Sequence, residues 1–174
     1  MKNGNRTKAA ESPIVYETEN DLPKDARAPL IDLLNERLAD VVDLDSQIKQ
    51  AHWNVKGPHF IGLHKLFDDI AEDVEDYSDL IAERAVQLGG IALGTVRVAA
   101  EKSTLEQYPL DIADGYNHVE AVARALSTFG REARMAIDEA DKLGDADTAD
   151  LFTEVSRGID KWLWFVEAHN QASK

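Results

Sequence analysis

Apolar residues recur at helical spacing in four long stretches of this chain. The first stretch follows Pro29, a residue type that favours the first turn of a helix. Gly57 and Pro58 interrupt the pattern and predict the end of this helix. The repeating apolar positions between these limits are Leu30, Leu34, Leu38, Val41, Ile48 and Val55.

The second stretch predicts a helix from about Ile61 to Leu88, which Gly89 and Gly90 end. Its apolar residues are separated by one, three or four positions, so they share one face of the helix. These residues are Leu63, Leu66, Phe67, Ile70, Val74, Tyr77, Ile81, Ala85 and Leu88.

Two further helices are predicted after a long connection at residues 91–112, which has room for a short helix of its own. One covers residues 114–143. The other begins at a cap, Asp147 or Thr148, and ends near His169. No stretch alternates as a strand does. Four long helices with a long middle crossover indicate an all-α fold, a four-helix bundle.

Residues 1–25 differ from the rest and predict a flexible tail before one domain at 26–174. The net charge of −14 repels nucleic-acid phosphates and attracts cations. The chain contains no Cys, which excludes disulfides, thiolate metal sites and cysteine nucleophiles. No secretory signal is visible and nothing reaches the length of a membrane span. We therefore expect a cytoplasmic protein.

The second predicted helix carries an acidic stripe opposite its apolar face. Its members recur every three or four residues, and a histidine precedes them at the same spacing. A solvated surface is one interpretation, because such faces are common on helices. A cation-binding face is the other. The stripe consists of His64, Asp68, Glu72, Glu75, Asp79 and Glu83.

Two pairs within this stripe have the spacing of metal ligands. His64 and Asp68 lie one turn apart, as do Asp79 and Glu83, and one cation can bind both members of a pair. The pairs are 15 residues apart. That is about 22 Å along a helix, too far for one ion. Two copies of the helix can pack antiparallel across a two-fold axis near residues 73 and 74. The first pair of one copy then faces the second pair of the other copy, and the symmetry produces two equivalent sites.

Metal sites inside a four-helix bundle use Glu-x-x-His on two helices. None of the five histidines has Glu three residues before it, which leaves the shared arrangement or no metal at all. By its angle, His52 falls on the apolar stripe of the first helix, where a buried, hydrogen-bonded histidine is the simplest interpretation. The same reasoning places Trp53 in the core.

Five segments form a recognisable pattern that extends over most of the chain from about residue 28 onward. They are QAHWNVKGPHFIGLHKLFDDI at 50–70, DLIAERAVQLGGIALGT at 79–95, YPLDI at 108–112, GDADTADLF at 144–152 and DKWLWFVEAH at 160–169. Together these segments resemble the Dps family, the mini-ferritins first described as DNA-binding proteins of starved cells. The resemblance implies a ferritin-like bundle whose crossover carries a short helix, and a hollow shell, a dodecamer built from two-fold dimers.

Members of this family bind Fe(II) between two-fold-related subunits, oxidise it, preferably with hydrogen peroxide, and store ferric mineral. By motif, one subunit supplies His52, His64 and Asp68, and its partner supplies Asp79 and Glu83. Imidazole and carboxylate ligands suit iron, and zinc accepts them too and would compete. The resemblance thus implies a ferroxidase that protects the cell from oxidative damage, and it makes His52 a ligand.

Further residues receive family roles by position. Trp53 corresponds to a tryptophan that quenches stray oxidising radicals. The carboxylates that correspond to mineral-seeding positions in the cavity are Asp69, Glu72 and Glu75. Those that correspond to a three-fold iron-entry pore are Asp141, Asp145 and Asp150. For these last three, capping of the turn is the alternative.

Many relatives condense DNA with a basic tail. Here the tail offers Lys2, Arg6 and Lys8, but the acidic chain opposes binding, so we expect weak, salt-sensitive DNA binding or none. A nucleoid-binding shell with secondary metal chemistry is the alternative function. A helical interaction module with a solvated acidic stripe is the third.

Overall fold

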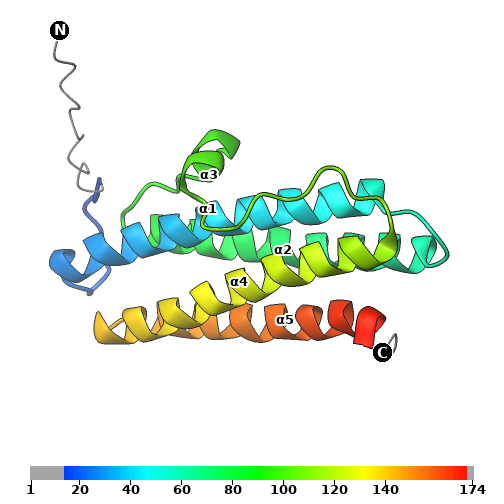
Figure 1. Cartoon of the computed structure of the whole chain (residues 1–174). Coiled ribbons are helices and arrows are strands. Elements are labelled where there is room, and N and C mark those ends of the chain that lie inside the picture. The colour runs from blue at the N-terminus through cyan, green and yellow to red at the C-terminus, as the bar shows by residue number, and fades with distance from the viewer. Residues whose placement is uncertain (1–13, 172–174) are drawn as a thin grey trace, which may run out of the picture.

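The computed structural model describes residues 14–171, which form an all-α bundle (Figure 1). Within this range there is no strand, only an isolated bridge between Lys56 and Asp114. The four long helices and the short helix in the crossover confirm the predicted fold. The helices are α1 (Lys24–Asn54), α2 (Phe60–Gln87), α3 (Val96–Lys102), α4 (Gly115–Lys142) and α5 (Ala146–Gln171).

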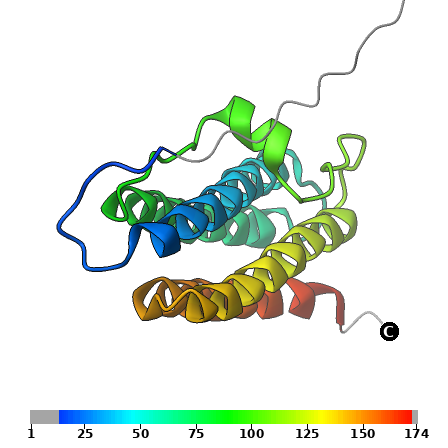
Figure 2. The ribbon, with the colours of Figure 1, turned by 90° about the vertical axis from the view of Figure 1, so that its left-hand side faces the viewer.

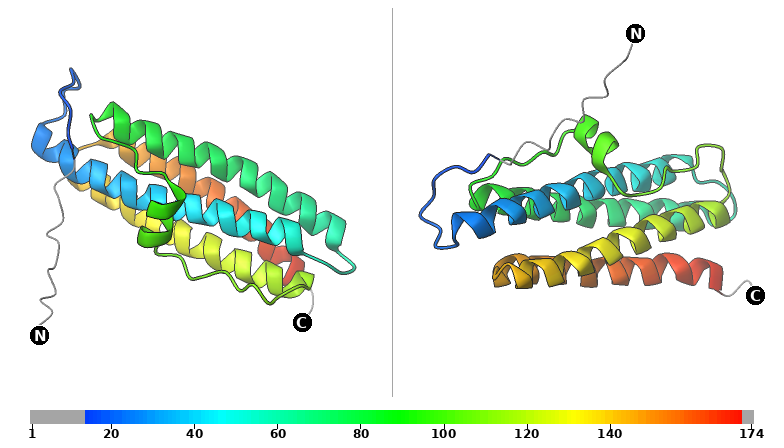
Figure 3. Two further views of the ribbon diagram at one scale, coloured as in Figure 1. Left: turned by 90° about the horizontal axis from the view of Figure 1, so that it is seen from above. Right: turned by 60° about the vertical axis from the view of Figure 1, so that its left-hand side comes forward.

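The long helices form two antiparallel pairs, α1 with α2 and α4 with α5 (Figure 1). Between α2 and α4 the chain crosses the length of the bundle beside α1, and α3 rests on α1 (Figures 2 and 3). The α1–α2 turn and the start of α4 therefore meet at one end, where the Lys56 N–H donates to the Ala113 carbonyl at 2.8 Å. In the described part of the chain, no helix combines the length and apolar character that a bilayer crossing requires.

The predicted apolar stripes meet in one core. Every apolar position predicted for α1 is buried, and in α2 only Leu66 and Tyr77 stay partly exposed. Phe67, Phe129 and Phe152 join α2, α4 and α5 and are fully buried. Removing one such ring from a core costs about 3–5 kcal/mol. This packing fixes which face of α2 remains at the surface.

Two helix starts differ from their predicted positions. Helix α1 begins at Lys24, so Pro29 lies inside the helix rather than in its first turn. Pro29 has no N–H to donate to the carbonyl one turn before it, so the helix lacks one intrahelical hydrogen bond there. The cap of α5 is Asp145, whose Oδ1 accepts from the Thr148 N–H at 3.2 Å. The predicted caps, Asp147 and Thr148, lie within the first turn.

Residues 14–22 lie against the bundle ahead of α1. The Tyr16 N–H donates to the Gly89 carbonyl at 2.7 Å. Arg27 is buried and donates to three carbonyls, two in this segment and one at the end of α2. The later part of the predicted tail is thus bound to the domain. The predicted DNA-binding residues lie outside the described residues: Lys2, Arg6 and Lys8.

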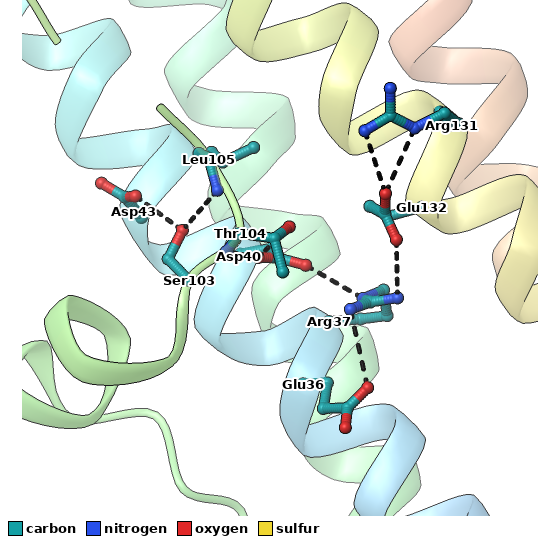
Figure 4. A network of polar contacts seen from close by, with 9 residues as sticks. All are labelled: Glu36, Arg37, Asp40, Asp43, Ser103, Thr104, Leu105, Arg131 and Glu132. Atoms are coloured by element: carbon teal, nitrogen blue, oxygen red, sulfur yellow. Dashed lines mark hydrogen bonds and ion pairs between the residues drawn. The ribbon is translucent and has the colours of Figure 1, made fainter. Parts of the chain in front are cut away.

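A buried polar network fixes the course of the crossover (Figure 4). Asp40 accepts from the backbone N–H and the hydroxyl of Thr104 at 2.6 and 3.0 Å. Its other oxygen lies 3.0 Å from Arg37, which reaches Glu132 of α4 at 3.3 Å. One set of charges therefore joins α1, the crossover and α4.

Candidate metal centre

The last turn of α1 and the first turns of α2 meet through two histidines. Nδ1 of His52 lies 2.7 Å from the carbonyl oxygen of His64, and Nδ1 of His64 lies 2.8 Å from that of His52. The rings stack with their centroids 3.8 Å apart. His52 is buried, as its place on the apolar stripe predicted, and its partner is the second candidate ligand.

These reciprocal hydrogen bonds determine which ring nitrogen is free. A carbonyl oxygen only accepts, so each Nδ1 carries a proton and donates it. The lone pair of each neutral ring is then on Nε2. Metal-binding histidines commonly donate their second nitrogen to a carbonyl or carboxylate, which fixes the ring and its tautomer. The geometry of His52 and His64 fits a pair of Nε2 ligands.

Asp68 lies one turn after His64, and its Oδ1 is 3.7 Å from Nδ1 of His52. The same oxygen accepts from Nζ of Lys49 at 2.7 Å. The Lys49 hydrogen bond is the main cause that lowers the pKa of Asp68, so the carboxylate is ionised at neutral pH. A cation that arrives here meets a carboxylate already paired with an ammonium group. Sequence reasoning missed Lys49, because its contact with Asp68 depends on how α1 packs against α2.

Asp79 and Glu83 lie further along α2 and do not join this group. Both side chains are exposed. Helix α2 is continuous from Phe60 to Gln87, so the two pairs stay far apart on it. Among residues 14–171, no three His, Asp or Glu side chains lie close enough together to hold a metal ion. One protomer therefore presents two separate half-sites.

A groove beside α2 extends between the half-sites. One part, of about 360 Å³, lies between α1 and α2 and contains Asp68. The other, of about 630 Å³, lies beneath the crossover and contains Asp79. Glu75 and Ser78 line both parts, so the two hollows adjoin each other. Asp45 of α1 faces the first part, and burial, followed by the charge of Glu75, raises the pKa of its carboxyl.

The carboxylates predicted to seed mineral are close to this groove. Glu72 and Glu75 line its first part, and Asp69 is exposed next to Asp68. Their role in nucleation stays a prediction. Sequence reasoning did not find Asp45, because its place in the groove depends on how α1 packs against α2.

Trp53 is not part of the core. Its side chain is 67 % exposed at the end of α1, so the core position that periodicity predicted is wrong. Successive helical residues point about 100° apart, so a buried His52 turns its neighbour toward the surface. An exposed indole next to a candidate ligand agrees with the position that the family resemblance gave it.

The three predicted pore residues fall into two environments. Asp141 and Asp150 are exposed, whereas Asp145 is 3 % exposed. Nη2 of Arg84 donates to both oxygens of Asp145 at 2.8 and 3.0 Å, and the Thr148 hydroxyl donates to it as well. Burial raises the pKa of Asp145, but hydrogen bonds from Thr148 and Arg84 outweigh it and lower that pKa. The capping alternative therefore fits Asp145, and the pore role of the three residues stays a prediction.

Comparisons with known proteins agree with this fold. A model of the ferritin-like domain matches residues 31–173. The "DNA protection during starvation protein" of Agrobacterium fabrum is 46 % identical over 156 residues, which cover 90 % of this chain and 96 % of that protein. The protein of the same name from Mycolicibacterium smegmatis is 32 % identical over 142 residues, covering 82 % of this chain and 77 % of that protein.

Solved structures show the same architecture. DpsA14 from Streptomyces coelicolor superposes with a TM-score of 0.86 at 33 % identity, covering 91 % of this chain and 94 % of that one. Dps from Microbacterium arborescens, solved in a high iron form, gives a TM-score of 0.79 at 32 % identity, covering 84 % and 95 %.

Proposed function

Because the chain belongs to the Dps family of ferritin-like proteins, we propose that it oxidises Fe(II) at sites shared by two protomers. Membership of the family gives it the iron-storage role of a mini-ferritin. The shared site, hydrogen peroxide as the oxidant and a dodecameric shell around the mineral are the proposal.

The observation that carries the proposal is the separation of the candidate ligands into two half-sites. His52, His64 and Asp68 gather at one end of α2, and Asp79 and Glu83 lie beyond the middle of the helix. An antiparallel partner brings its own acids to the histidines, and two-fold symmetry repeats the site. Each site then has two imidazoles and one carboxylate from one protomer, with Asp79 and Glu83 of the partner subunit.

Exposed apolar side chains beside the half-sites support such an interface. Ile61 and Leu80 are 59 % and 39 % exposed on α2, and Trp53 is exposed at the end of α1. One exposed apolar side chain thus stands next to each half-site, where a partner protomer would cover it.

The charge of the shared site favours oxidation. Three carboxylates and two neutral imidazoles give it three negative charges, which stabilise Fe(III) more than Fe(II). Hydrogen peroxide takes one electron from each of two Fe(II) ions and, with two protons, becomes two water molecules. Electrons taken in pairs release no hydroxyl radical. The ferric product hydrolyses, and exposed acids such as Glu72 and Glu75 bind it as mineral grows.

Stopped-flow absorbance of Fe(III) formation after mixing with peroxide tests the proposal. His64→Ala and Asp79→Ala should each slow the fast phase at least about 100-fold, since even supporting residues of metal sites contribute about 10- to 100-fold. Asp138→Asn removes an exposed acid of α4 and is the matched control. Wild-type rates in either ligand variant, with the shell intact, would falsify the proposed site.

A further inference from the structure

Helix α2 is centred on the point where the ligand spacing predicts the two-fold axis. The helix begins at Phe60 and ends at Gln87, so its midpoint lies between Asp73 and Val74. The ligand positions of α2 that would face each other across the axis have the same midpoint. The bounds of the helix depend on its own chain and not on a metal. Two separate observations therefore favour an antiparallel second copy in one register.

An exposed apolar side chain lies near each end of this helix. Ile61 is 59 % exposed and Val86 is 56 % exposed. Ile61 precedes His64 by three residues, and Val86 follows Glu83 by three residues. The two apolar positions are thus centred on the same point as the ligands. An antiparallel copy in this register brings Ile61 opposite Val86 of the partner subunit.

These two side chains also point in the directions that the ligands take. Ile61 and Asp79 are 18 residues apart, and so are Asp68 and Val86. Eighteen residues make about five full turns, so the members of each pair share one direction around α2. Asp68 and the partner's Asp79 must approach each other to share a cation. Ile61 and Val86 of the partner subunit then approach each other in the same way.

The charges along α2 fit the same arrangement. Lys65 is exposed and is also 18 residues from Glu83, so both side chains share one direction around the helix. In this register the partner's Ala82 lies opposite Lys65, and the partner's Glu83 is the next residue. A basic side chain therefore meets an acidic one across the interface. Such complementary charges fix the register in which two copies pack.

We propose that Ile61 of each protomer packs against Val86 of the partner subunit and that this contact closes the outer end of each shared site. The inference rests on the proposed function, which supplies the antiparallel dimer. Ile61 lies about 4.5 Å beyond His64 along the helix axis, so an apolar contact there excludes water from that side of the cation. Attraction between a cation and carboxylates is stronger where water is excluded.

Disulfide formation tests the contact without any metal. The chain contains no Cys, so Ile61→Cys and Val86→Cys introduce its only thiols. Within one chain the two positions are about 37 Å apart along α2, so a disulfide between them must join two chains. Treatment of metal-free shells of the double variant with diamide should convert most chains into dimers on a non-reducing gel.

Gln87→Cys combined with Ile61→Cys is the matched control. Gln87 is exposed and adjoins Val86, but its side chain points about 100° away around the helix. This variant and each single Cys variant should give few dimers. If the first double variant does not assemble, shells mixed from Ile61→Cys and Val86→Cys subunits replace it, because each mixed dimer contains one complete Cys pair. Assembled shells that form no more dimers than the control overturn the inference.

Removal of bound Zn²⁺ tests the closure. The double variant Ile61→Ala and Val86→Ala lacks the contact, so EDTA should extract Zn²⁺ from its shells several-fold faster than from the wild type. Met135→Ala changes an exposed apolar residue of α4 and should leave the rate unchanged. Equal rates in the double variant and the wild type overturn the closing role.

These experiments separate the inference from the proposed function. Specific cross-links in shells that fail to oxidise Fe(II) would refute the proposed function and leave the contact between protomers standing. Normal oxidation of Fe(II) at shared sites, without specific cross-links in assembled shells, overturns the inference alone.

Discussion

Nζ of Lys49 lies 2.7 Å from Oδ1 of Asp68, so a lysine already holds one of the candidate iron ligands. The carboxylate is 56 % exposed and the lysine 30 %, and ion pairs at such exposure are weak. A divalent cation that also binds two imidazoles can displace the ammonium group. Lys49 therefore competes with the cation for the Asp68 carboxylate but does not prevent the cation from binding.

Replacement of Lys49 by Met should therefore strengthen cation binding a few-fold, because the variant removes both the competing ion pair and a positive charge. Calorimetric titration of iron-free shells with Zn²⁺ measures this without redox chemistry. Lys49→Arg keeps the charge and should bind Zn²⁺ much as the wild type does. Weaker binding in Lys49→Met would show that the lysine supports the site instead.

Asp145→Ala should destabilise the protein by about 3–5 kcal/mol, since it removes the buried carboxylate that pairs with the Arg84 guanidinium and leaves only the exposed Asp147, 3.9 Å away, as a counter-charge. Asp150→Ala removes an exposed acid near the start of α5 and should have little effect. Chemical unfolding followed by circular dichroism measures the difference. Equal stability of the two variants would contradict the structural role assigned to Asp145.

The ion pair between Asp145 and Arg84 should make the stability of the protein depend on pH. The pKa of Asp145 is lower in the folded protein than in the unfolded chain, where it is about 3.9. Its contribution to stability is therefore fully present above the unfolded-state pKa and is lost as pH falls through the lower folded-state value. Melting temperatures of wild type and Asp145→Ala should differ most at neutral pH and converge at acidic pH.

Asp141 and Asp150 remain candidates for an iron-entry pore. Their joint replacement by Asn should slow uptake of Fe(II) several-fold at low ionic strength, and high salt should reduce the difference because it screens attraction. Asp138→Asn again serves as the control. An effect that is independent of salt would indicate that the turn itself has been disturbed.

DNA binding by the tail should be weak and lost at physiological salt. Only three basic side chains attract the DNA phosphates, whereas the net charge of −14 on the chain repels them. A gel shift with plasmid DNA measures it. Firm retardation by the full chain, abolished when residues 1–10 are deleted, would show that the tail overcomes the acidic surface.

Most of the fold could be predicted from periodicity. The apolar residues from Leu63 to Leu88 recur at helical spacing, so they predict a helix that buries this face against other helices. The start of α5 could not, since three neighbouring polar residues all have capping chemistry and only Arg84, distant in sequence, selects Asp145. Trp53 was misplaced because periodicity gives the direction of a side chain around the helix axis. It does not say how wide the buried face of that helix is.

The candidate site was predictable as far as it lies on one helix. The spacing of His64, Asp68, Asp79 and Glu83 predicted two half-sites, whereas His52 required the family resemblance because a buried histidine is ordinary in a core. Lys49 reaches Asp68 only after α1 and α2 have packed. Such contacts between helices leave no periodic signal.

Co-assembly of two defective subunits tests the shared site most directly. In a dimer of His64→Ala with Asp79→Ala, one site receives both lesions and the other receives neither. Random mixing should restore about a quarter of the sites, since half of the dimers are mixed and each has one intact site. We predict that mixed shells oxidise Fe(II) at about a quarter of the wild-type rate, while shells of either variant alone stay inactive. Inactive mixed shells of normal size would contradict the shared site.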